Sequence, residues 1–99
     1  MEDKKVYIDE DLKAIIPQFF RNREDDIENI KEFLAEDNYE EIRIIGHSMK
    51  GSGGGYGFDY ITEIGKKIED SAVEKNEDRI RDSIKKLEEY IQNVTIVYK

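Results

Sequence analysis

The sequence predicts an all-α fold, an antiparallel four-helix bundle with a short extra helix at its N-terminus. Apolar residues recur at intervals of three and four along four segments, which is the spacing of a buried helical stripe. The segments are joined by very short polar connections such as Lys75-Asn76, and connections of that length join antiparallel neighbours. With 99 residues and 37% hydrophobic side chains, the chain has material for one modest core, so we expect residues 1–99 to form a single domain.

The N-terminal part begins with a β-prone stretch at residues 6–8. Asp9 is then placed to cap a short helix that continues through Leu12 and Ile15 to Ile16. The first long helix spans about 17–35, and Pro17 suits its first position because no N–H is needed there. Its expected buried residues are Phe20, Ile27, Ile30, Phe33 and Leu34.

The second long helix follows a turn at Asp37-Asn38. It starts near Tyr39 and reaches at least Met49, and we take 39–52 as helical. Three successive glycines at 53–55 should weaken this helix and end or kink it before Tyr56, because glycine costs about 0.5–1 kcal/mol relative to alanine in a helix.

The last two helices show the clearest periodicity. One spans about 59–74 and buries Phe58, Ile61, Ile64, Ile68 and Ala72. The other spans about 77–94, with Asn76 as its N-cap, and buries Ile80, Ile84, Leu87, Ile91 and Val94. The β-prone residues 95–98 are expected to pack as an extended tail against helix ends, with pairing to residues 6–8 as the alternative.

Composition excludes several classes of function. A formal charge of −8 argues against a nucleic-acid binder, and the lack of cysteine excludes disulfides and thiolate chemistry. The sequence has no signal-peptide pattern and no apolar run near the roughly 20 residues that span a bilayer. We therefore expect a soluble, cytoplasmic protein that touches neither membrane nor nucleic acid, and its polar outer faces favour a monomer.

The segment 42–58 departs from this pattern, because six of the seven glycines lie between Gly46 and Gly57. On a helical wheel that starts at Ile42, Met49 and Ile45 fall on the core face, whereas His47 falls at about 140°, nearly opposite. The only histidine of the chain should therefore point into solvent. Its neighbours one turn away are Arg43, Ile44, Lys50 and Gly51, with Gly54 one turn beyond.

These neighbours suit the approach of another macromolecule to the imidazole: a cation, an exposed apolar residue and positions without side chains. The residues required for nucleotide binding, for serine-based catalysis or for a metal site are absent from this segment. The spacing fits neither a P-loop nor a Rossmann glycine fingerprint, no serine lies three or four residues from His47, and no clustered carboxylates or Glu-x-x-His motif provide a metal site. An exposed imidazole nitrogen can instead accept a phosphoryl group, and Lys50 can neutralise part of its charge.

The residues His47-Ser48-Met49-Lys50-Gly51-Ser52-Gly53, with Gly57 beyond, resemble the motif of histidine-containing phosphotransfer (HPt) domains. The resemblance implies a four-helix bundle that relays phosphoryl groups between receiver-domain aspartates in two-component phosphorelays. It implies that His47 is the phosphorylated residue, that Lys50 stabilises the phosphoryl group and that Gly51 keeps the approach open. Such a domain is a phosphoryl carrier without kinase activity of its own.

The resemblance also implies the partners, which are response-regulator receiver domains and a hybrid sensor histidine kinase. The receiver supplies Mg²⁺, so no cofactor of the chain's own is expected. On this interpretation Arg43, Ile44, Gly51 and Gly54 form the partner-binding face. The alternative is a helical adaptor that binds a receiver or kinase without phosphoryl transfer. Taken one by one, Lys50 and Ile44 could also be ordinary surface residues, and Gly53 to Gly55 could form a flexible loop between helices.

Overall fold

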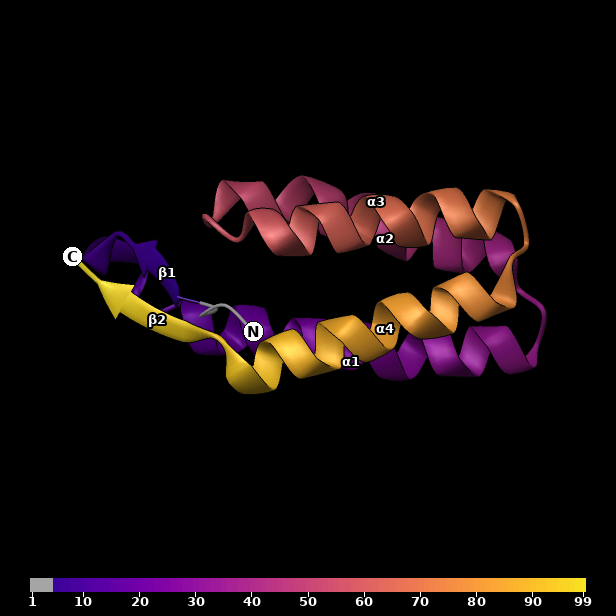
Figure 1. The fold of residues 1–99 in the computed structure, drawn as a ribbon, viewed down its shortest axis with the longest axis horizontal. Helices are drawn as coiled ribbons and strands as arrows, with labels where there is room; N and C mark the ends of the chain where they lie inside the picture. Colours follow the sequence, from indigo (N-terminus) through magenta and orange to yellow (C-terminus); the bar gives the residue numbers. More distant parts are fainter. Residues whose placement is uncertain (1–4) are drawn as a thin grey trace.

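The computed structural model describes residues 5–99 and confirms the predicted four-helix bundle. The helices are α1 (Ile16–Ala35), α2 (Tyr39–Gly55), α3 (Asp59–Val73) and α4 (Glu77–Asn93). Successive helices run in opposite directions, with the α2–α3 pair on one side and the α1–α4 pair on the other (Figure 1). The two ends of the described range, residues 5–99, lie at the end of the bundle where α2 turns into α3 (Figure 1).

Side-chain caps start two of the helices, and one of them, Asn76, was predicted from the sequence. The Asn38 side chain accepts a hydrogen bond from the backbone N–H of Glu41 at 3.4 Å, and Asn76 accepts one from Arg79 at 3.1 Å. Such caps satisfy N–H groups that have no partner inside the helix. The first and last residues of α1, α3 and α4 lie within one residue of the positions predicted from the sequence.

The extra N-terminal helix is shorter than expected. A single 3-10 turn, Glu10–Leu12, takes its place, and Asp9 caps it by accepting from the backbone N–H of Asp11 at 2.8 Å. The expected continuation to Ile16 is wrong. Pro17 has no N–H to donate to the carbonyl of Lys13, so one continuous helix through this point would lose a backbone hydrogen bond and be kinked or broken.

Helix α2 continues through all three glycines and ends at Gly55, directly before Tyr56. Tertiary packing holds this weak stretch against α3, because a Cβ on Gly53 would lie 2.7 Å from the backbone N of Thr62. The Thr62 hydroxyl also donates to the carbonyl of Lys50 at 3.1 Å. The turn that follows requires Gly57, whose φ of +91° strains any residue with a side chain.

The two β-prone ends pair with each other. Strands β1 (Lys5–Ile8) and β2 (Thr95–Tyr98) form a parallel two-stranded sheet in which Val6 faces Ile96 and Ile8 faces Tyr98. The chain ends are thus tied together instead of lying as separate tails.

The core is built from the stripes that the sequence predicts, with one exchange in α1. Phe19 is 4% exposed and packs on Phe58 and Tyr56 at ring-centroid distances of 5.4 and 4.7 Å, whereas Phe20 is only partly buried. Three further residues that were expected to be buried, Phe33, Ile91 and Val94, are only partly buried and pack against the core. The fully enclosed large side chains on the four helices and the α2–α3 turn are Ile16, Ile27, Ile30, Ile42, Met49, Phe58, Ile61, Ile68, Ile80 and Leu87. Since Ile42 and Met49 anchor one side of α2, the opposite side of that helix must face outward.

Candidate phosphoacceptor site on helix α2

The His47 side chain projects from the outer face of α2 and is 65% exposed, whereas Met49 is fully buried. The orientation predicted from the helical wheel is therefore observed. The Lys50 side chain, one turn further along the same helix, is 36% exposed. Both groups are therefore open to a large partner.

Two glycines bring α3 unusually close to this part of α2. A Cβ on Gly65 would lie 2.5 Å from the backbone N of Lys50 and 2.8 Å from the carbonyl oxygen of Gly46. A Cβ on Gly46 would lie 2.7 Å from the backbone N of Glu69. Only glycine at both positions permits this backbone contact, and the contact places Glu69 of α3 beside the histidine.

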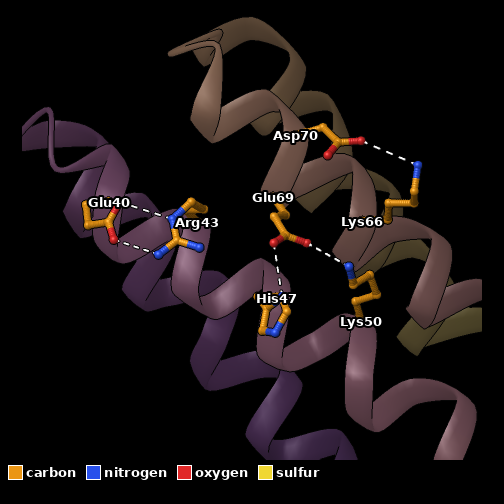
Figure 2. Close-up of polar contacts among 7 residues, drawn as sticks. All are labelled: Glu40, Arg43, His47, Lys50, Lys66, Glu69 and Asp70. Atoms are coloured by element: carbon orange, nitrogen blue, oxygen red, sulfur yellow. Dashed lines mark hydrogen bonds and ion pairs between the residues drawn. The ribbon is translucent and has the colours of Figure 1, made fainter.

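Glu69 bridges the two predicted site residues, as Figure 2 shows. Its Oε2 lies 3.0 Å from Nδ1 of His47, and its Oε1 lies 3.1 Å from Nζ of Lys50. The Glu69 side chain is only 17% exposed. Each carboxylate oxygen thus has its own nitrogen partner, and the three side chains form one polar cluster across the α2–α3 interface.

The electrostatics of this cluster keep Glu69 ionised. The hydrogen bond from Lys50 lowers the pKa of the Glu69 carboxyl, the hydrogen bond with His47 acts in the same direction, and partial burial opposes both. An ionised carboxylate can only accept hydrogen bonds, so Nδ1 of a neutral His47 carries the proton. The lone pair then resides on Nε2, the ring nitrogen on the side away from Glu69 in Figure 2.

The predicted partner-binding residues share the outer face of α2 but differ in how open they are. Ile44 is 45% exposed, and the space beside Gly51 is open, because a Cβ placed there would have no heavy atom within 4 Å apart from its chain neighbours and the backbone of its own helix. Gly54 is exposed, but a Cβ on it would contact Thr62 Oγ1 at 3.4 Å. Arg43 is held by Glu40, with Nε–Oε1 and Nη2–Oε2 distances of 3.1 and 2.7 Å (Figure 2).

Glu69 is the member of the cluster that the sequence reading missed. It is one of 24 acidic residues, and nothing in its immediate neighbourhood distinguishes it. The feature of the sequence that could have identified Glu69 is Gly65, a lone glycine inside a strongly amphipathic helix, one turn before Glu69. Such a glycine indicates a close approach of another backbone, and the residue one turn away then faces the same neighbour.

Ser52 of the motif faces inward and has a structural environment. Its hydroxyl donates to the carbonyl of Met49 at 3.4 Å and accepts from Nη1 of Arg23 at 3.3 Å. Arg23 is 9% exposed and also pairs with Asp26 at 2.8 Å. This serine therefore helps to join α2 to α1, and it does not contact His47.

Comparison of the sequence with known protein families gives a match that includes His47, Lys50 and Glu69. The sequence matches the Hpt domain family over residues 14–95, most of the chain. The chain belongs to the Hpt domain family. Hpt domains are phosphoryl carriers of two-component phosphorelays, and they work with receiver domains and kinases. No curated protein and no solved structure gave a match.

None of the helices in residues 5–99 of this Hpt domain has the length and apolar character needed to cross a membrane. That part of the chain also has no group of three or more His, Asp or Glu side chains arranged to hold a metal ion.

Proposed function

We propose that this Hpt domain carries a phosphoryl group on Nε2 of His47 and relays it between receiver-domain aspartates. The observation that supports this proposal is the exposed imidazole whose Nδ1 is held by the Glu69 carboxylate at 3.0 Å. That contact leaves Nε2 as the nucleophilic nitrogen and directs it outward. No other described side chain on the outer face of α2 combines exposure with a nucleophile oriented in this way.

In the proposed transfer, the Nε2 lone pair attacks the phosphorus of a receiver's aspartyl phosphate. A P–N bond forms, the P–O bond to the aspartate breaks, and the carboxylate leaves with the electron pair. Nδ1 keeps its proton, so the ring becomes cationic and faces the negative Glu69. Transfer onward reverses these events, because an acceptor carboxylate oxygen attacks the phosphorus and the electron pair returns to Nε2.

Lys50 supplies positive charge near the phosphoryl oxygens. It stands one helical turn from His47, and its ammonium group is already within 3.1 Å of Glu69. A phosphoryl group on Nε2 adds a second anionic partner for that ammonium group. The Mg²⁺ ion and the remaining catalytic groups are assigned to the receiver, and a hybrid sensor histidine kinase is the proposed original donor.

The face that receives the partner comprises Ile44 and Gly51, with Arg43 and Gly54 at its borders. Ile44 offers an apolar contact, and the open space at Gly51 lets a partner's backbone or side chains approach within reach of His47. The Arg43 guanidinium is paired with Glu40, so a partner carboxylate must compete for it.

The test is phosphoryl transfer from a panel of phosphorylated receiver domains, measured by intact mass and by the acid and base stability of the adduct. An acid-labile, base-stable adduct of one phosphoryl group is expected, and it should be absent from His47→Gln. Because His47 is the only histidine in the sequence, no second histidine confuses the assignment. Continued labelling of His47→Gln would refute the proposal.

A matched pair of lysine variants tests the role of Lys50. Lys50→Ala should slow the transfer, whereas Lys66→Ala, which removes an exposed lysine paired only with Asp70 at 3.6 Å, should not. A receiver that binds the wild type and His47→Gln equally, with no transfer to either, would favour the adaptor function instead.

A further inference from the structure

A groove with a volume of about 300 Å³ lies between α3 and α4. Two serines, three basic side chains and two aspartates line it, and none of them belongs to the His47 cluster. The phosphotransfer proposal makes no use of this groove.

Two hydroxyl groups lie deep in the groove with no hydrogen-bond partner among residues 5–99. Ser71 of α3 is 4% exposed, and Ser83 of α4 is 5% exposed. Neither side chain makes a hydrogen bond with any described residue. Every side-chain oxygen in residues 5–99 that is completely shielded from solvent has a hydrogen-bond partner. Because the hydroxyls of Ser71 and Ser83 have none, they cannot be completely shielded, and both must be accessible from the groove. Polar groups at this depth are normally hydrogen-bonded, so these two are available to a bound molecule.

The walls of the groove carry more positive than negative charge, although the whole chain has a formal charge of −8. Both aspartates are already paired with lysines: Asp82 with Lys86 at 3.2 Å, and Asp70 with Lys66 at 3.6 Å. Arg79 makes a single long contact with Glu74, at 3.5 Å. Lys67 forms no ion pair with any described residue, so its charge is uncompensated.

We propose that this groove binds a small oxyanion, a single phosphate or carboxylate group on a compact molecule. Ser71 and Ser83 would donate their hydroxyl hydrogens to the anion, while Lys67 and Arg79 supply the positive charge. The volume is at the lower limit for ligand pockets, and the two aspartates in the walls repel highly charged ligands. Both features favour a compact ligand with one anionic group over a nucleotide.

The experiment is a ¹H–¹⁵N NMR titration of the full chain with inorganic phosphate, repeated with acetate and with chloride at matched ionic strength. Saturable shifts are expected at the amides of residues 67, 71, 79 and 83 with phosphate, acetate or both, and not with chloride. The anion that saturates identifies the preferred group. Equal, non-saturating shifts with all three salts would show ionic screening only and would overturn the proposal.

Variants locate the effect. Lys67→Ala changes an exposed side chain and should weaken binding at least tenfold, whereas Lys85→Ala, an exposed lysine of α4 outside the groove, should not. Ser71→Ala together with Ser83→Ala should also weaken binding tenfold or more, provided that its thermal melt matches the wild type. If Lys67→Ala binds normally, or if phosphate shifts only residues 43–54 around His47, the groove is not the site. The titration uses no phosphoryl transfer, so its outcome is independent of the proposed function.

Discussion

Gly65→Ala tests whether the close approach of α2 and α3 builds the His47 cluster. The new Cβ would lie 2.5 Å from the backbone N of Lys50, where ordinary contacts start at 3.4 Å. All the nearest atoms are backbone, so no side-chain rotation can relieve the clash, and the two helices must separate by about 0.9 Å. If Glu69 moves with α3, its distance to Nδ1 of His47 grows from 3.0 Å to about 3.9 Å, beyond hydrogen-bond range.

The cost of this substitution has two opposing parts. Forcing an extra methyl group into a packed interface costs about 1–3 kcal/mol, and replacing glycine by alanine in a helix returns up to about 1 kcal/mol. The two parts together span a net loss of about 0–3 kcal/mol. Because all the clashing atoms are backbone, we expect about 1–2 kcal/mol, which lowers the Tm of a domain of this size by about 4–16 °C. The losses are measured by thermal and urea melts followed by circular dichroism.

The matched control is Gly51→Ala on the outer face of α2. A Cβ there meets no heavy atom within 4 Å, so only the gain in helix propensity remains, and the variant should be more stable by about 0.5–1 kcal/mol. The ring ¹⁵N shifts of His47 give the second measurement: Gly65→Ala should lose the fixed Nδ1–H form, and Gly51→Ala should keep it. Wild-type stability together with an unchanged Nδ1–H signal in Gly65→Ala would refute the reasoning.

Three further predictions concern single groups. Gly51→Gln should slow transfer from a phosphorylated receiver without loss of stability, because the larger side chain fills the open space on the docking face; an unchanged rate would show that the partner does not use that space. Glu69 has a lowered pKa, so its ion pairs stabilise the fold above pH 4.5, its ordinary value, and that contribution disappears as pH falls through the folded-state pKa. The free energy of unfolding of wild type should therefore exceed that of Glu69→Ala at pH 7, and the gap should close on acidification; a gap that is constant between pH 7 and pH 3 would contradict the assignment. Burial raises the pKa of Tyr90 to about 12, so absorbance titration of the wild type and Tyr90→Phe should show one tyrosine fewer ionising near pH 12 in the variant, with no difference near pH 10.

Local patterns along the chain were sufficient to predict most of the fold. Periodic apolar residues located all four long helices because each helix must bury one stripe, and that requirement is visible in consecutive residues. The outward orientation of His47 followed from the same rule applied to α2. The predicted length of the N-terminal helix was wrong. The prediction followed apolar spacing alone, and that spacing does not show that Pro17 cannot donate a backbone hydrogen bond to the preceding turn.

Features that join distant segments were harder to predict. The pairing of β1 with β2 was considered only as the alternative to a packed tail, because β propensity does not decide between the two for residues about ninety positions apart. The continuation of α2 through Gly53 depends on its contact with Thr62 of α3. Low helix propensity in the glycine stretch is outweighed by packing that only the folded chain provides.

By itself, the sequence determined the helix class, the number of helices, the exposed position of His47 and the placement of Lys50 beside it, because these follow from spacing within single helices. Only the tertiary structure decided which carboxylate meets the imidazole. Glu69 comes from another helix, and it reaches His47 because Gly46 and Gly65 let two backbones touch. The distance between two helices depends on how the side chains of both helices pack together, and the spacing of residues within one helix does not contain that information.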